Sequence, residues 1–197
     1  MTTLCLYFQQ ESLRLRNGKM AKVLVKKSGK KGNGVFALRN FKKGELIFRF
    51  NLVKLKKYTL KEISKFPPDK SDHCDYAGRG KYTIDFMPGS YMNHSCDPNT
   101  YIEMKTLGKK EVIAFKPIKK GEELTHDYTL SSIDQVLKNT YHWKMNCYCR
   151  SKNCRKTIQG NFFKLPKRIQ KEKLVYLPTW FKRKYRKQLL RIKSKFR

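Results

Sequence analysis

Three cysteines stand close together in the run Cys147-Tyr-Cys-Arg-Ser-Lys-Asn-Cys154. A structural zinc site takes four tetrahedral ligands, so this run needs one more ligand from elsewhere in the chain. Cys96 lies among residues that favour a tight turn, Asn93-His-Ser-Cys-Asp-Pro-Asn99, whereas the surroundings of Cys5 and Cys74 carry no such signal. A turn would hold the Cys96 thiol in place. The predicted metal ligands are therefore Cys96, Cys147, Cys149 and Cys154.

The chain carries a large excess of positive charge. Its 46 Lys and Arg stand against 15 Asp and Glu, a formal net charge of +31. Such a balance predicts a polyanionic partner, nucleic acid before an anionic membrane, although a lysine-rich proteome could also produce it. Residues 160–197 contribute nine Lys, five Arg and one Glu, a formal +13. This tail could bind phosphates or lie on a membrane, or it could be a solvated helix that packs an apolar stripe on the domain.

We expect no secretory signal sequence at the start of the chain. Residues 1–10 lack a basic stretch followed by a long apolar one. The chain has no run of about 18 apolar residues, so we expect no transmembrane segment. An intracellular location follows as an expectation. Disulfides would be an alternative for the cysteines, but they fit a reducing compartment poorly.

Period-two patterns with β-branched and aromatic residues predict a strand-rich domain. The expected strands are Lys22–Lys26, Gly34–Leu38, Leu46–Phe50, Tyr82–Phe86, Thr100–Met104, Glu111–Phe115 and Glu123–Tyr128. Thr59 and Glu62 form a capping-box pattern that begins a helix, and this helix must end before Pro67. The residues alone thus predict strands with one small helical insert.

A nine-residue segment is echoed later in the chain. Residues 37–45, Ala-Leu-Arg-Asn-Phe-Lys-Lys-Gly-Glu, match residues 114–122, Ala-Phe-Lys-Pro-Ile-Lys-Lys-Gly-Glu. Two distant copies do not make a solenoid. We expect them to form two equivalent corners of a β fold.

Several motifs together resemble those of SET-domain protein lysine methyltransferases. Residues 31–37 (Lys-Gly-Asn-Gly-Val-Phe-Ala) look like the first motif of that family, 93–99 like the central one, and 121–128 (Gly-Glu-Glu-Leu-Thr-His-Asp-Tyr) like the third. The cysteine run is similar to the post-SET C-x-C-x4-C segment, whose zinc the family completes with the cysteine of the central motif. The likeness covers residues of about 22–160.

The resemblance implies a mainly β fold, the SET β-clip with a knot-like crossing of two segments. It implies an N-terminal extension (1–21), a SET domain (22–130) with an insert (about 51–80) beside the substrate groove, a zinc-stapled post-SET segment (141–160) and a basic tail (161–197).

The resemblance also implies S-adenosylmethionine and Zn²⁺ as cofactors and assigns roles to residues. Tyr128 would be catalytic, and Tyr82 and His126 would line the substrate channel. His126 stands where the family usually carries Phe or Tyr, a position that commonly governs how many methyl groups are added. The residues implied in cofactor binding are Lys31, Gly32, Asn33, Gly34, Phe36, Tyr91, Asn93 and His94.

The implied function is methylation of a lysine in a basic protein such as a histone, a histone-like protein or a ribosomal protein, by a monomeric enzyme. The implied location is the nucleus and chromatin for a eukaryotic or viral protein, and otherwise the cytoplasm or a host cell. One alternative is a non-catalytic chromatin or nucleic-acid binding module on a SET scaffold. A plain zinc-ribbon binder would need paired C-x-x-C knuckles, which this sequence lacks.

Overall fold

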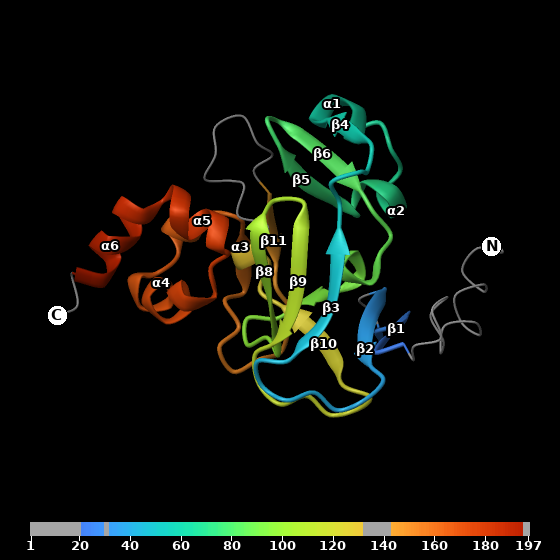
Figure 1. Cartoon of the computed structure of the whole chain (residues 1–197), viewed down its shortest axis with the longest axis horizontal. Helices are drawn as coiled ribbons and strands as arrows, with labels where there is room; N and C mark the ends of the chain where they lie inside the picture. The colour runs from blue at the N-terminus through green and yellow to red at the C-terminus, as the bar shows by residue number, and fades with distance from the viewer. Residues whose placement is uncertain (1–20, 30–31, 132–142, 195–197) are drawn as a thin grey trace.

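The computed structural model describes residues 21–29, 32–131 and 143–194 (Figure 1). Most of the N-terminal extension expected over residues 1–21 lies outside the described residues, and so do Lys31 and Cys5.

Short strands dominate the described part of the chain and form four small sheets. Their hydrogen-bonded orders are β1-β2-β10-β7, β3-β9-β8, β4-β6-β5 and β11-β12. The strands are β1 (Val23–Lys27), β2 (Asn33–Ala37), β3 (Leu46–Asn51), β4 (Lys57–Thr59), β5 (Cys74–Gly78), β6 (Lys81–Ile84), β7 (Asn93–His94), β8 (Thr100–Thr106), β9 (Lys109–Ala114), β10 (Glu123–His126), β11 (Lys144–Asn146) and β12 (Thr157–Gln159). A mainly β fold is therefore confirmed.

All seven predicted strands are present as β1, β2, β3, β6, β8, β9 and β10, with ends that differ by at most two residues. The last one ends early, at His126, because α3 (Tyr128–Ser131) begins where the strand was expected to continue. The Asp127 carboxylate accepts the Thr129 N–H at 3.1 Å and so favours a helical turn at that point. Five of the described strands were not predicted. β4, β7, β11 and β12 have three residues or fewer and offer too little alternation to detect. β5 has five residues, but its sequence Cys-Asp-Tyr-Ala-Gly includes Asp and Gly, which are depleted in strands.

The echoed segments 37–45 and 114–122 pair with each other. Phe41 and Ile118 hold the same position in the two copies and exchange two backbone hydrogen bonds of 2.8 and 3.0 Å. Gly44 and Gly121 close the two turns at φ 81° and 87°, in the left-handed region that glycine adopts without a Cβ penalty. The other equivalent bonds are Gly44 N–H to Ala114 O with Gly121 N–H to Ala37 O, and Ala114 N–H to Glu45 O with Ala37 N–H to Glu122 O. The two expected corners are thus equivalent and bind each other, because each backbone hydrogen bond from the first segment to the second has a counterpart in the opposite direction.

The insert carries two one-turn helices. Thr59 caps α1 (Leu60–Ile63) with a complete capping box, since its hydroxyl accepts the Glu62 N–H at 3.2 Å and the Glu62 carboxylate accepts the Thr59 N–H at 2.6 Å. The chain leaves α1 before Pro67, and α2 (Pro68–Ser71) then begins at a proline. These helices lie beside the β4-β6-β5 sheet at one end of the molecule (Figure 1).

Residues 161–194 form a C-terminal helical unit with a core of its own. It contains α4 (Lys167–Lys173), α5 (Thr179–Lys184), α6 (Arg186–Ser194) and the short 3-10 turns η4 (Phe162–Lys164) and η5 (Leu174–Tyr176). Its buried residues include Phe162, Leu177 and Phe181, each fully enclosed. A second core lies between the β1-β2-β10-β7 and β3-β9-β8 sheets and includes Val35, Ile47 and Leu124, and Trp180 packs against both cores.

The C-terminal helical unit packs on β8 and its surroundings, on the side of the molecule away from β1 and β2 (Figure 1). The Tyr176 ring lies 4.4 Å from Phe115 and 5.8 Å from Tyr101, measured between centroids. The Glu103 carboxylate accepts the Thr179 N–H at 2.9 Å. The apolar stripe of the expected basic tail is therefore buried. None of the described helices has the length and apolar character that a bilayer crossing requires.

Candidate active site and metal centre

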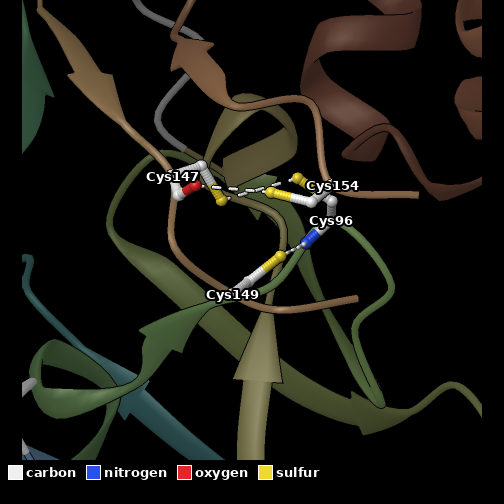
Figure 2. A group of neighbouring side chains, drawn as sticks. All are labelled: Cys96, Cys147, Cys149 and Cys154. Carbon is white, nitrogen blue, oxygen red and sulfur yellow. Dashed lines mark hydrogen bonds between the residues drawn. The ribbon is translucent and has the colours of Figure 1, made fainter. Parts of the chain in front are cut away.

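The four predicted metal ligands come together as one cluster. The sulfur atoms of Cys96, Cys147, Cys149 and Cys154 all lie within 4.8 Å of one another (Figure 2). Thiolates around a tetrahedral zinc at about 2.3 Å stand about 3.8 Å apart. The Cys96 and Cys147 sulfurs are 3.7 Å apart, which fits this spacing and is far longer than the roughly 2.05 Å of a disulfide. The donor set fits a closed structural zinc site, and the cluster could hold a metal ion.

The cluster joins two distant parts of the chain. Cys96 follows β7, whereas the other three cysteines lie in the loop between β11 and β12. Backbone N–H groups point at the sulfurs, because Cys96 N–H lies 3.5 Å from Cys149 Sγ and Arg155 N–H lies 3.3 Å from Cys96 Sγ. Such contacts stabilise thiolates. The expected three-plus-one arrangement is therefore present, and Cys74 does not take part in it.

The thiols differ in acidity for physical reasons. Burial raises the pKa of Cys96 and of Cys147. Burial would also raise the pKa of Cys149, but the Cys96 N–H and the Ser151 hydroxyl outweigh it and lower that pKa to about 6. A divalent cation would stabilise all the thiolates, since only the deprotonated form binds metal.

Asn93 and His94 lie where two distant segments cross. They form β7, which pairs in parallel with Thr125 and His126 of β10. The Asn93 amide donates to the Asn33 carbonyl at 3.0 Å and to the Glu123 carboxylate at 2.6 Å. The first, central and third motifs thus meet through one side chain.

Gly34 lies very close to side chains of the protein itself, and its implied role in cofactor binding stays a prediction. A Cβ at this position would overlap the Glu123 carboxylate and lie 2.9 Å from the Ser28 Cβ. The Ser28 hydroxyl donates to the same Glu123 oxygen at 2.8 Å. Sequence reasoning missed Glu123, because a glutamate near a strand start usually faces solvent.

Tyr128 sits at the crossing, at the start of α3. Its hydroxyl donates to the Met92 carbonyl at 2.9 Å, and its backbone N–H donates to His94 Nδ1 at 3.2 Å. Its ring lies against two imidazoles, 5.3 Å from His94 and 4.9 Å from His126 between centroids. Burial, with a smaller effect of Glu123, raises the Tyr128 pKa to about 12. The phenol is therefore protonated at neutral pH.

His126 is buried and uncharged at neutral pH. Burial, followed by the nearby His94 and Lys110, lowers its pKa to about 3. Its Nδ1 lies 3.0 Å from the Ser131 hydroxyl. Its implied place in a substrate channel stays a prediction.

The remaining predicted residues are placed less centrally. Tyr82 is buried in the insert sheet against Tyr76, at 5.4 Å between ring centroids. Tyr91 packs against His73 at 4.6 Å, and Phe36 stacks under the Lys26 ammonium at 4.3 Å. Their assigned roles stay predictions.

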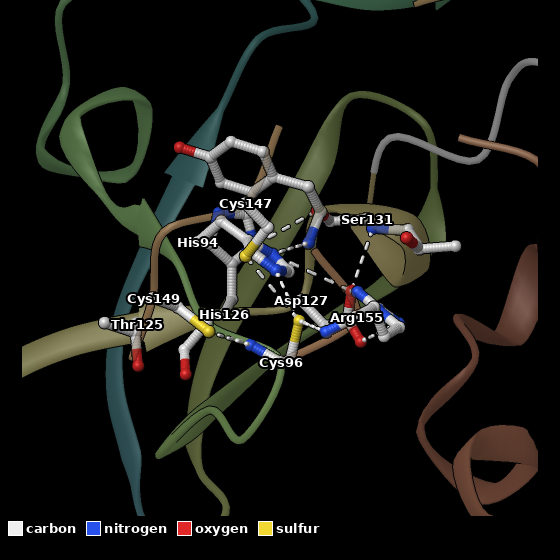
Figure 3. A network of polar contacts seen from close by, with 12 residues as sticks. His94, Cys96, Thr125, His126, Asp127, Ser131, Cys147, Cys149 and Arg155 are labelled. Carbon is white, nitrogen blue, oxygen red and sulfur yellow. Dashed lines mark hydrogen bonds and ion pairs between the residues drawn. The ribbon is translucent and has the colours of Figure 1, made fainter. Parts of the chain in front are cut away.

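Two charged residues at the centre were not predicted. The Arg155 guanidinium binds the Asp127 carboxylate through two hydrogen bonds of 2.9 and 2.6 Å (Figure 3). The side chains are 11% and 0% exposed. An aspartate directly after a half-buried strand indicates that a buried cationic partner exists. The sequence does not show which of the chain's many Lys and Arg is that partner.

Comparisons with known proteins agree with this geometry. Residues 32–129 match the SET domain family. The chain is 29% identical over 161 residues to "Probable histone-lysine N-methyltransferase set-23" of Caenorhabditis briggsae, which covers 73% of this chain and 63% of that protein. It is 30% identical over 146 residues to "Histone-lysine N-methyltransferase Set2" of Drosophila melanogaster, covering 69% of this chain and 6% of that protein.

A solved structure shows the same fold. The methyltransferase domain of human histone-lysine N-methyltransferase SETMAR superposes with a TM-score of 0.51 at 21% identity, covering 75% of this chain and 61% of that one. The chain thus spans less than two thirds of each of these proteins. It has the SET-domain fold and belongs to the SET-domain family.

Proposed function

We propose that this chain is a protein-lysine N-methyltransferase that uses S-adenosylmethionine and acts on a histone or another basic protein, such as a histone-like or ribosomal protein. The carrying observation is the placement of Tyr128 at the β7–β10 crossing, with its hydroxyl on the Met92 carbonyl and its ring against His126. The names of the SET relatives support a histone substrate.

The residues at the crossing suit transfer to a neutral amine. When bound, S-adenosylmethionine supplies an electrophilic methyl group on a sulfonium. A lysine amine that has lost its proton to water would take this methyl group as the carbon–sulfur bond breaks. A lysine has a reference pKa of about 10.4, which desolvation in a narrow channel lowers. Neutral His126 adds no repelling charge.

Tyr128 orients the amine in this proposal and does not act as a base. A phenol with a pKa of about 12 keeps its proton at neutral pH. Since that proton is committed to the Met92 carbonyl, the lone pairs of the hydroxyl oxygen are available to the polarised methyl and to the amine. Alignment of donor and acceptor then supplies the rate enhancement.

The proposed cofactor site is built from the motifs that Asn93 ties together. The main chain of residues 31–36 would hold the methionine portion, and Asn93, His94 and Tyr91 the adenosine side. The four cluster cysteines would hold structural zinc, which staples a post-SET segment (141–160) to the SET domain (22–130). The insert, about 51–80, would flank the substrate groove.

Incubation with labelled S-adenosylmethionine and a panel of histones, nucleosomes and ribosomal proteins tests the activity. Label in a histone, lost in Tyr128→Phe, is the expected result. A titration of cofactor separates the alternative, a non-catalytic chromatin module on a SET scaffold. Absence of both cofactor binding and label transfer would favour that module.

The proposal includes nucleic acid as a partner, because a basic enzyme would otherwise repel a basic substrate. The C-terminal helical unit offers the exposed charge, with Glu172 as its single acidic residue. A nuclear, chromatin-bound location follows from this partner, and the proposal takes the enzyme to be a monomer. Up to residue 192, where the described side chains end, the exposed basic residues of the unit are Lys164, Lys167, Arg168, Lys171, Arg183, Lys184, Arg186, Lys187 and Arg191.

Salt dependence of DNA binding tests this surface. Removing one phosphate-binding side chain should reduce the slope of log affinity against log salt by about 0.9. We expect the double variant Arg168→Gln/Lys171→Gln to flatten the slope by about 1.8, and the control Lys119→Gln/Lys120→Gln, exposed on another part of the chain, to leave it unchanged. An equal effect of both pairs would refute a dedicated surface. Binding to anionic vesicles but not to DNA would favour a membrane.

A further inference from the structure

Arg155 connects the cysteine cluster to the segment that carries Tyr128. It directly follows Cys154, and its own backbone N–H lies 3.3 Å from Cys96 Sγ. Its guanidinium grips both oxygens of Asp127, the residue directly before Tyr128 (Figure 3). Paired, parallel hydrogen bonds of this kind fix orientation as well as distance.

Asp127 shapes the backbone on which Tyr128 sits. Its carboxylate accepts the Thr129 N–H at 3.1 Å, and its carbonyl accepts the Leu130 N–H at 2.9 Å. These bonds end β10 and begin α3. A carboxylate that rotated away would leave the first turn of α3 uncapped, and Tyr128 is the first residue of that turn.

His94 provides a second connection between the same two parts. Its Nδ1 accepts the Tyr128 N–H at 3.2 Å, so that nitrogen carries no proton. The proton of the neutral ring is then on Nε2, which lies 3.3 Å from Cys96 Sγ and can donate to it. The backbone at Tyr128 is thus connected to the cysteine cluster twice, once through Asp127 and Arg155 and once through His94.

We propose that Arg155 is a positioning residue for Tyr128: it holds Asp127, and through it the first turn of α3, in the reactive position while the cysteine segment is docked. The inference rests on the proposed methyl transfer. Metal binding in this scheme does more than staple the chain, because it places the tyrosine at the crossing.

Stability alone gives no sufficient reason for this ion pair. Burying two charges costs desolvation free energy, and a well-packed apolar pair is often equally stable. An apolar pair could not supply the two directed hydrogen bonds with which the Arg155 guanidinium fixes the orientation of the Asp127 carboxylate. Positioning therefore predicts an effect on turnover that is separate from folding.

Arg155→Lys tests the proposal, because lysine keeps the charge and most of the stem but cannot bind both oxygens in one plane. We expect kcat to fall about tenfold to a hundredfold, since a displacement of about 1 Å at the reacting centre can cost about a hundredfold. The KM values, the zinc content and the unfolding temperature should stay close to wild type. Arg150→Lys is the matched control, in the same segment but exposed.

Amide hydrogen exchange gives a readout that needs no turnover. The amides of Tyr128, Thr129 and Leu130 should exchange faster in Arg155→Lys and in zinc-depleted wild type, while amides of the β8–β9 pair should not change. Wild-type kcat and unchanged exchange in Arg155→Lys would overturn the proposal. A fall in kcat that tracks zinc loss or unfolding would overturn it too, by reducing Arg155 to a structural role. A wild-type protein without methyl transfer would instead refute the proposed function, and the exchange experiment would still test the linkage.

Discussion

Cys96→Ser should weaken zinc binding by about two orders of magnitude. Structural zinc sites bind with about 10–16 kcal/mol, so one of four equivalent thiolates contributes about 3 kcal/mol, which corresponds to about a hundredfold in affinity. Cys96 is a demanding position, because its sulfur also meets the Arg155 N–H and His94 Nε2, both at 3.3 Å. A serine hydroxyl has a shorter bond to Cβ and a harder donor atom than a thiolate. It therefore cannot bind the metal and also meet the Arg155 N–H and His94 Nε2.

The measurement is competition for zinc between the protein and a chromogenic chelator of known affinity, with total metal determined by mass spectrometry. Cys149→Ser should lose a similar amount, since its sulfur is an equivalent ligand of the same cluster. Cys74→Ser is the matched control, because Cys74 lies outside the cluster. Loss of the metal should also reduce cofactor affinity, because the β11–β12 segment would detach.

Equal zinc affinities of Cys96→Ser and Cys74→Ser would refute the three-plus-one site. A loss confined to Cys149→Ser would mean that the run near residue 150 finds its fourth ligand elsewhere.

Three further changes probe the active site. Tyr128→Phe should fold and bind cofactor, with about 1 kcal/mol lost from the missing bond to the Met92 carbonyl, yet lose most turnover; near-normal rates would remove the hydroxyl from the mechanism. Wild type should make di- or trimethyl-lysine, because an imidazole leaves more room than a phenol, and His126→Tyr should shift products toward monomethyl-lysine, as read by mass spectrometry; a wild type that stops at one methyl would contradict this. The folded His126 pKa of about 3 lies below the ordinary value of about 6.5, so the unfolded chain binds the extra proton and stability is lost as pH falls from 6.5 toward 3. Urea unfolding should therefore show about 2 kcal/mol less acid destabilisation at pH 5 in His126→Phe than in wild type, and parallel curves would refute the buried neutral state.

Local patterns in the sequence determined most of the regular structure. Alternation of side chains predicted seven of the strands, and Thr59 with Glu62 predicted the start of α1, because periodicity and capping act within a few residues. The cysteine spacing predicted three of the four metal ligands for the same reason, and the turn-forming residues around Cys96 indicated the fourth. The family motifs then located Tyr128, Asn93 and His94.

Tertiary structure alone decided how those parts meet. Ser28 and Glu123 are 95 residues apart in sequence, and Asp127 and Arg155 are 28 apart, yet each pair is in direct contact. A chain with 46 basic residues offers many partners for one buried carboxylate, and no local pattern selects among them. The sequence of the tail likewise showed its charge but not its hydrophobic core. Its helices are short, and they are stabilised by packing against β8 and against each other. Local residue chemistry therefore fixed the elements and the ligand types, while long-range packing fixed the crossing, the buried ion pair and the position of Tyr128.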